Sequence, residues 1–132
     1  MARPVLIIED NADIAELLRY ILEQEHFETR VALTGEEGLA ASLDKDNPPL
    51  AILLDMLLPG MSGQEICRRL RREPSTRNTP IIMVSARASV ADIALGLSAG
   101  ADEYIRKPFS VSQIIARVHA LTSSHRAKAP SD

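Results

Sequence analysis

The chain has 132 residues, of which 45% are hydrophobic and 25% are charged. This length suits one globular domain, because single domains commonly contain about 100 to 200 residues. A net charge of −3 gives no field that would hold nucleic-acid phosphates, and two tyrosines and two phenylalanines are too few for a base-stacking surface. The sequence therefore predicts no direct nucleic-acid ligand.

Apolar runs and cysteine content both favour a cytoplasmic protein. The longest runs, such as residues 5–8 and 50–54, are far shorter than the roughly 18 residues that a membrane span needs. The N-terminus also lacks the long apolar core of a signal peptide. Cys67 is the only cysteine, so no internal disulfide can form, and its neighbours Ile66 and Leu70 indicate a buried, unreactive side chain.

Short apolar runs alternate with helical patterns along the chain, and this alternation predicts a parallel sheet with helices on both faces. The first, third and fourth runs are apolar at nearly every position, which is typical of central strands. The second and fifth carry polar residues and suit the edges. The expected fold class is therefore α/β, a doubly wound five-stranded parallel sheet. The runs lie at residues 5–8, 29–32, 50–54, 81–84 and 104–105.

Between these runs, apolar residues recur at the helical period and define one buried stripe for each of five helices. Each helix begins with a residue that can cap its first turn, namely Asn11, Thr34, Ser62, Ser89 or Ser110. The expected buried stripes are Ile14, Leu17, Leu18, Ile21 and Leu22; Leu39, Ala40 and Leu43; Ile66, Cys67 and Leu70; Val90, Ile93, Ala94 and Leu97; and Val111, Ile114, Ile115 and Val118.

Polar residues follow the strands at the edge where a doubly wound sheet binds its ligands. Ligands lie beyond the carboxyl ends of the strands, where the strand order reverses, which for the flavodoxin-like order 2-1-3-4-5 is between the first and third strands. The first strand ends in Glu9 and Asp10 and the third in Asp55, while Ser85 and Lys107 end the fourth and fifth. The sequence therefore predicts three carboxylates, a hydroxyl and an ammonium in one crevice.

The charge of this crevice predicts a metal ion. Three carboxylates and one lysine leave a formal charge of −2, and such repulsion is costly in a partly dehydrated site. Oxygen donors without histidine or cysteine favour Mg²⁺, with Mn²⁺ as an alternative. A carboxylate beside a metal and a lysine can act as a nucleophile toward a phosphoryl group.

Five short motifs carry a family resemblance over about 90% of the chain. They read VLIIED at residues 5–10, LDMLLPGMSG at 54–63, VSA at 84–86, GADEYI at 100–105 and KPF at 107–109. In this order they resemble the receiver domain of a two-component response regulator. The domain is expected to cover residues 1–122, and residues 123–132 are predicted to be a flexible tail or the start of a linker.

The resemblance implies a role for each of the acidic residues in phosphoryl transfer or metal binding. Asp55 is implied to be the phosphoacceptor and, with Asp10, a side-chain ligand of Mg²⁺. The main-chain carbonyl of Leu57 is implied to be a further ligand. Glu9 stands where the family more often has aspartate, and it is expected to interact with the metal ion through a water molecule.

The resemblance also implies a switch. Ser85 occupies the position of the switch hydroxyl, Tyr104 that of the switch aromatic residue, and Lys107 that of the lysine that contacts the phosphate. The family usually has a cis peptide before the proline that follows this lysine, so the bond from Lys107 to Pro108 is expected to be cis.

These features together indicate a phosphorylation-activated signalling switch rather than a conventional enzyme. A sensor histidine kinase or phosphotransfer protein would be the donor, and the domain would catalyse only its own phosphotransfer and dephosphorylation. A phosphohydrolase generally needs an acid two residues after the nucleophile, where this chain has Leu57. A phosphorylation-independent interaction module would have no need of Asp55, Asp10 and Lys107 together. The alternative that stays open is the receiver portion of a longer DNA-binding transcriptional regulator.

The output is expected on the surface formed by the fourth helix, the fifth strand and the fifth helix. Leu95 lies off the predicted stripe of the fourth helix, and Glu103, Tyr104, Arg106 and Arg117 are expected to border the same surface. We expect a downstream protein partner or a symmetric homodimer to bind there.

The one basic cluster lies late in the third helix and contains Arg68, Arg69, Arg71 and Arg72. Positive side chains near a helix C-terminus interact favourably with the helix dipole. The cluster is therefore predicted to be a solvated helix end rather than a binding patch.

Overall fold

Five parallel strands form one sheet in the order β2-β1-β3-β4-β5 in the computed structural model, which describes residues 3–128. This confirms the predicted α/β class and strand order. The strands are β1 (Val5–Ile8), β2 (Thr29–Ala32), β3 (Ala51–Leu54), β4 (Ile81–Ser85) and β5 (Glu103–Arg106), and the helices are α1 (Ala12–Gln24), α2 (Gly35–Ser42), α3 (Gly63–Arg72), α4 (Val90–Ala99) and α5 (Val111–Lys128).

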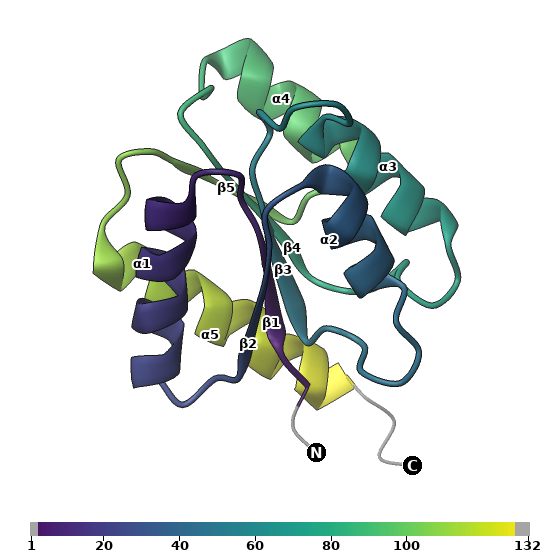
Figure 1. The fold of residues 1–132 in the computed structure, drawn as a ribbon, viewed down its shortest axis with the longest axis vertical. Coiled ribbons are helices and arrows are strands. Elements are labelled where there is room, and N and C mark those ends of the chain that lie inside the picture. The colour runs from purple at the N-terminus through teal and green to yellow at the C-terminus, as the bar shows by residue number, and fades with distance from the viewer. Residues whose placement is uncertain (1–2, 129–132) are drawn as a thin grey trace.

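Helices cover both faces of the sheet, with α1 and α5 on one side and α2, α3 and α4 on the other (Figure 1). Successive strand side chains point to opposite faces. Val5 and Ile7 of β1 therefore pack in the core beneath α1 and α5, whereas Leu6 and Ile8 pack in the core beneath α2 and α3. Burial on both faces explains why the central strands are apolar at nearly every position.

The predicted caps and the predicted cis bond are confirmed. The side chains of Asn11, Thr34, Ser62, Ser89 and Ser110 each accept a hydrogen bond from a main-chain N–H in the first turn of their helix. The peptide bond between Lys107 and Pro108 is cis. Local sequence signals therefore locate the helix starts, whereas the cis bond was implied by the family resemblance.

Helix α4 packs differently from its predicted stripe. Val90 and Leu97, which begin and end that stripe, are 88% and 45% exposed, whereas Gly96 and Ala99 are buried. A Cβ atom at Gly96 would lie 2.8 Å from Cε2 of Tyr104, so α4 approaches the sheet too closely for a larger side chain. The prediction is wrong because the small residues, not the large apolar ones, face the core.

Other stripes need smaller corrections. Leu17 in α1 and Val111 in α5 are 46% and 49% exposed, and Ala40 in α2 is also exposed. In α2 the closest contact with the sheet is made by Gly38, where a Cβ atom would lie 2.6 Å from Cδ1 of Ile8. Hydrophobic periodicity therefore identifies these helices but does not always identify the residues that touch the sheet.

The stripe of α3 is confirmed, and Cys67 is part of it. Ile66, Cys67 and Leu70 are fully buried. Burial raises the pKa of the Cys67 thiol to about 11. Because the thiolate is the reactive form of cysteine, this side chain acts as a packing residue at neutral pH.

Helix α5 continues to Lys128, inside the segment that the sequence predicts to be a tail or linker. The end of that segment, residues 129–132, lies outside the described residues, and the boundary at residue 122 stays a prediction. None of the helices within residues 3–128 is both long enough and apolar enough to cross a membrane.

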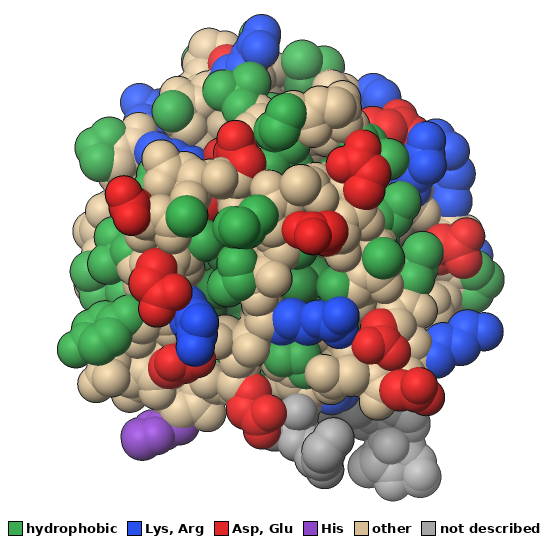
Figure 2. Space-filling view, viewed as in Figure 1, with side chains coloured by type: hydrophobic (Ala, Val, Ile, Leu, Met, Phe, Trp, Pro, Cys, Tyr) green, Lys and Arg blue, Asp and Glu red, His purple; other side chains and the backbone are tan. Residues whose placement is uncertain are grey.

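The basic cluster of α3 contains two kinds of arginine. Arg68, Arg69 and Arg72 are exposed, as predicted, and blue side chains mark this edge of the molecule in Figure 2. Arg71 is different, because its side chain is only 20% exposed and its Nη2 atom lies 3.0 Å from Oδ2 of Asp102. Arg71 thereby ties the end of α3 to the loops before β4 and β5. Its guanidinium also donates hydrogen bonds to the carbonyls of Thr76, Arg77, Thr79 and Gly100.

Replacing Arg71 by alanine is expected to lower the free energy of unfolding by about 2 to 3 kcal/mol, because partly buried carbonyls lose a charged donor. Urea denaturation followed by circular dichroism measures this change. Arg72→Ala is the matched control, since Arg72 is exposed in the same helical turn, and a change within about 0.5 kcal/mol is expected there. Equal denaturation midpoints for the two variants would contradict the structural role of Arg71.

Candidate functional site

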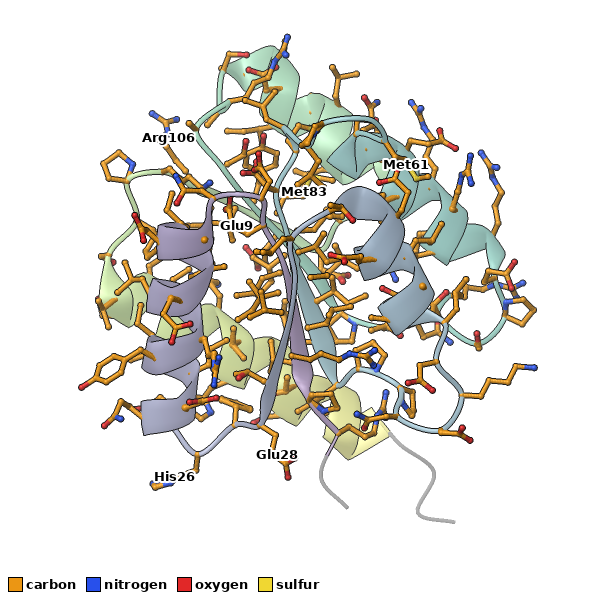
Figure 3. All side chains as sticks on the ribbon, viewed as in Figure 1. Glu9, His26, Glu28, Met61, Met83 and Arg106 are labelled. Atoms are coloured by element: carbon orange, nitrogen blue, oxygen red, sulfur yellow. The ribbon has the colours of Figure 1, made fainter. Side chains whose placement is uncertain are left out.

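The register of the central strands brings acidic residues together at the carboxyl edge of the sheet. Ile8 is paired with Leu54, so the residues that follow them, Glu9 and Asp55, lie side by side where β1 and β3 end. Figure 3 shows Glu9 at this edge, at the upper end of the sheet. Carboxylate oxygens of Glu9, Asp10 and Asp55 all lie within 4.8 Å of one another. The predicted acidic crevice is therefore present.

Lys107 reaches into this crevice from the end of β5. Its Nζ atom lies 2.7 Å from Oε1 of Glu9 and 2.8 Å from Oδ2 of Asp55. Its main-chain N–H donates a 2.9 Å hydrogen bond to the carbonyl of Ser85, which ends β4 and is fully buried. The five residues predicted for the site thus come together at the carboxyl ends of neighbouring strands.

Burial sets the electrostatics of the crevice. Glu9 and Asp55 are nearly inaccessible, whereas Asp10 is exposed. Burial raises the pKa of Glu9, although hydrogen bonds from Lys107 and from the main chain of Asn11 oppose this effect. Burial also disfavours the Lys107 ammonium, but hydrogen bonds to Asp55 and Glu9 outweigh it and raise the pKa of Lys107. Lys107 is therefore charged at neutral pH and offsets part of the negative charge.

The direct contact between Glu9 and Lys107 was not anticipated from the sequence, which suggested only a water-mediated part for Glu9 in a metal site. The glutamate reaches Lys107 because the two strand ends lie on opposite sides of Asp55 and both long side chains point into the same crevice. In this arrangement Glu9 is an ion-pair partner of the lysine.

The main chain after β3 orients Asp55. Its Oδ1 atom accepts a 2.9 Å hydrogen bond from the N–H of Leu57. The first residue of α3, Gly63, packs directly on the same segment and donates a 3.1 Å hydrogen bond to the carbonyl of Met56. A Cβ atom on Gly63 would lie only 2.1 Å from the carbonyl oxygen of Asp55. The glycine in this motif therefore permits close contact between α3 and the site.

The two predicted switch residues meet at the main chain of Arg87, which the sequence analysis did not find. The Oγ atom of Ser85 accepts a 3.1 Å hydrogen bond from the Arg87 N–H. The hydroxyl of Tyr104 donates to the Arg87 carbonyl, and burial raises the pKa of Tyr104. No residue type was required at position 87 for these bonds, because both use main-chain atoms, so the sequence carried no signal for them.

The donor set of the crevice fits a hard divalent cation. Its three clustered ligand candidates are all carboxylates, and carboxylate oxygens are the ligands that Mg²⁺ prefers over softer nitrogen or sulfur. The exposed Asp10 leaves one side of the cluster open to water, which suits an ion that keeps several water ligands.

The family model for the response regulator receiver domain matches residues 5–119. The chain belongs to this family. A receiver domain is a phosphoacceptor signalling domain of two-component systems rather than a conventional enzyme, and this agrees with the acidic crevice found here. The phosphoacceptor role is implied by the family, while the part of each individual residue stays a prediction.

Two regulators of about twice this length are similar in sequence. The phosphate regulon transcriptional regulatory protein PhoB of Rhizobium meliloti is 44% identical over 121 residues, which cover 92% of this chain and 52% of that protein. The DNA-binding response regulator MtrA of Mycobacterium tuberculosis is 40% identical over 120 residues, or 91% and 50% of the two chains. This receiver chain thus spans about half the length of either relative.

Solved receiver domains share the fold. A CheY-like receiver domain protein of Methanospirillum hungatei has a TM-score of 0.89 at 28% identity and covers 98% of this chain and 100% of that one. A putative response regulator of Chloroflexus aurantiacus has a TM-score of 0.86 at 34% identity, covering 93% and 99%. The PA1611 receiver domain of Pseudomonas aeruginosa, solved with magnesium in its active-site cleft, has a TM-score of 0.84 at 24% identity, covering 93% and 99%.

Proposed function

We propose that this receiver domain is a phosphorylation-dependent switch in which Asp55 accepts a phosphoryl group from a phosphohistidine. A sensor histidine kinase or a phosphotransfer protein would carry that phosphohistidine. A bond forms between phosphorus and a carboxylate oxygen of Asp55, while the phosphorus–nitrogen bond of the donor breaks and the imidazole nitrogen keeps the electron pair. The contact of the buried Asp55 carboxylate with Lys107, beside two further acids, is the observation that carries this proposal.

A magnesium ion belongs to the proposed reaction, with Mn²⁺ as a substitute. Asp10, Asp55 and the main-chain carbonyl of Leu57 would hold it, and Glu9 would contribute through water. When bound, the ion offsets negative charge on the transferring phosphoryl oxygens. The magnesium in the PA1611 receiver domain lies in the active-site cleft of the same fold, and this supports the proposal.

The chain's own residues then respond to the new phosphoryl oxygens. Lys107 turns from the carboxylate it now contacts toward those oxygens, and the Ser85 hydroxyl donates a hydrogen bond to them. A change at Ser85 reaches Tyr104 through the main chain between them, and the surface of α4, β5 and α5 changes with it. The catalytic and switch roles of Asp55, Lys107, Ser85 and Tyr104 are all part of this proposal.

The proposal is tested by intact mass after incubation with a small phosphodonor and Mg²⁺. We expect the mass to rise by one phosphoryl group and the rise to disappear when the metal is chelated. An unchanged mass in the presence of Mg²⁺, with the fold intact by circular dichroism, would contradict the proposed phosphoacceptor role.

Lys107→Ala is expected to keep the fold but to weaken binding of beryllofluoride, a phosphoryl mimic, at least about tenfold, because the lost ammonium would face the phosphoryl oxygens. Circular dichroism checks the fold and a titration followed by NMR measures the affinity. Lys45→Ala removes the same charge from an exposed position and serves as the control. Wholesale unfolding of Lys107→Ala would instead show that the lysine is structural.

A second candidate is that this domain is the receiver portion of a longer DNA-binding transcriptional regulator. The names of the PhoB and MtrA relatives, each about twice the length of this chain, favour it. In that case an effector domain would contact DNA, and the receiver itself would bind neither nucleic acid nor a membrane. A cytoplasmic location is proposed for either candidate.

The proposed output surface is rich in exposed apolar side chains on α4. Val90 is 88% and Leu97 is 45% exposed, and Arg117 of α5 lies 3.6 Å from Glu103 of β5. Leu95, which was expected here, instead lies on the side of α4 that faces the loop after β3. An apolar patch bordered by charged residues is typical of a protein-binding surface. We therefore propose that a homodimer or a downstream partner binds here.

Beryllofluoride with Mg²⁺ is expected to convert the monomer to a dimer in sedimentation experiments, and Leu97→Glu is expected to prevent this. Leu17→Glu is the matched control because Leu17 of α1 is similarly exposed, at 46%, but lies on the opposite face of the sheet. A monomer in both states at high concentration would eliminate the dimer and leave a heterologous partner as the output.

A further inference from the structure

Arg87 makes three contacts that together connect the switch residues to α4. Its N–H donates to Oγ of Ser85 at 3.1 Å, and its carbonyl accepts from the Tyr104 hydroxyl. Its Nε atom donates a 3.0 Å hydrogen bond to Oδ1 of Asp92 in the first turn of α4. The main chain of one residue is therefore bound to both switch residues, while its side chain is bound to the helix.

The acceptor of this side chain is firmly part of α4. The Oδ2 atom of Asp92 accepts hydrogen bonds from the Ser89 hydroxyl at 2.7 Å and from the Ser89 N–H at 3.1 Å, which completes the capping box of the helix. Hydrogen bonds from Ser89 and the neighbouring Arg87 lower the pKa of Asp92. The carboxylate is thus ionised at neutral pH, and a displacement of Arg87 acts on the helix start through it.

The structure also leaves space into which this end of α4 can move. A groove of about 230 Å³ separates the loop after β3 from the start of α4; Met56 and Leu57 line one side, and Arg87, Asp92 and Leu95 line the other. The helix is not anchored at this end by large core residues, since the buried residues of α4 within the described chain are Gly96 and Ala99.

We propose that Arg87 is a positioning residue that transmits the state of Ser85 and Tyr104 to the first turn of α4. This inference rests on the proposed phosphorylation of Asp55. When the Ser85 hydroxyl moves toward the phosphoryl oxygens, the Arg87 peptide follows because its N–H is bonded to that hydroxyl. The ion pair with Asp92 carries this movement to α4, while Arg87 itself has no contact with the phosphoryl group.

The amide NMR shifts that beryllofluoride and Mg²⁺ induce in the wild type and in Arg87→Gln test the link. The substitution removes the ion pair but keeps both main-chain bonds. In the variant we expect the induced shifts of Ser85 and Lys107 to persist, and those of residues 90–97 to fall to less than about half of the wild-type values. Arg87→Lys, which keeps a cation opposite Asp92, is expected to restore most of the response. Arg72→Gln removes an exposed arginine from α3 and is expected to leave the response unchanged.

Each outcome decides between the two proposals. Wild-type shifts in α4 that are fully retained in Arg87→Gln would overturn the role of Arg87 and leave the switch itself intact. Loss of the Ser85 and Lys107 shifts in Arg87→Gln would also overturn it, because the variant would then act on binding rather than on coupling. A wild-type chain that shows no shift at the site would overturn the proposed function and this inference with it.

Discussion

Asp55→Asn is expected to abolish phosphoryl labelling completely while leaving the fold intact. The amide oxygen of asparagine is a poor nucleophile, so no phosphorus–oxygen bond can form. Asparagine has nearly the same size as aspartate and its carbonyl oxygen can still accept the hydrogen bond from the Leu57 N–H. The amide nitrogen then takes the place of Oδ2, which accepts from Lys107 in the wild type, so Lys107 keeps only Glu9 as its partner while the packing around residue 55 is kept. Intact mass after exposure to a small phosphodonor and Mg²⁺ measures the loss of labelling.

Asp13→Asn is the matched control for this experiment. Asp13 is an exposed acid in the first turn of α1, so its substitution removes the same charge without touching the crevice, and wild-type labelling is expected. Asp10→Asn should fall between the two, because it keeps the nucleophile but removes a proposed metal ligand. Undiminished labelling of Asp55→Asn would place the phosphoacceptor at another residue.

Gly63→Ala is expected to destabilise the domain by about 3 kcal/mol, the upper range for inserting one methyl group into a tightly packed site. The new Cβ atom would lie 2.1 Å from the carbonyl oxygen of Asp55 and 2.8 Å from the Cα atom of Met56. Both of these are main-chain atoms, so neither can rotate away. Relief of the clash requires α3 to move away from the loop that carries Asp55. Urea denaturation measures the change in stability.

The neighbouring substitution Gln64→Ala provides the control for Gly63→Ala. It also places alanine in the first turn of α3, but Gln64 is only half-buried and its Cβ atom is already accommodated. We expect a change within about 1 kcal/mol for this control, since most substitutions without a specific clash are mild. Gly63→Ala should in addition slow phosphoryl labelling, because the displaced segment holds the nucleophile. Equal stability of the two variants would contradict the close packing of α3 on the site.

The position of the site could be predicted because it depends mostly on strand order and strand ends. Apolar runs locate the strands, and the first one or two residues after each run then fall at the carboxyl edge by geometry alone. Glu9, Asp55 and Lys107 come together for this reason, without any requirement on the helices. The roles within the site were carried by the family resemblance, since residue types alone do not distinguish a nucleophile from a metal ligand.

The contacts made by α4 and by two arginines could not be predicted, because they depend on distances between elements. Gly96 of α4 faces the core of the domain because the helix lies close to Tyr104. A periodic pattern of apolar residues does not predict how closely two elements approach. Arg71 and Arg72 are adjacent arginines with similar sequence neighbours, yet of these two only Arg71 contacts the loops before β4 and β5. Ser85 and Tyr104 both bond to the main chain of Arg87, and sequence patterns do not predict bonds to main-chain atoms.

The thin apolar contact of α4 implies an uneven distribution of local stability across the domain. Helix α3 buries Ile66, Cys67 and Leu70, whereas α4 buries a glycine and an alanine within the described chain. Each large aliphatic side chain removed from water contributes about 1.5 to 3 kcal/mol. Partial opening of α4 therefore costs far less free energy than opening of α3, and its amides should exchange with solvent through fluctuations that leave the sheet folded. The helix beside the switch can thus loosen more easily than α3 while the core of the domain stays folded.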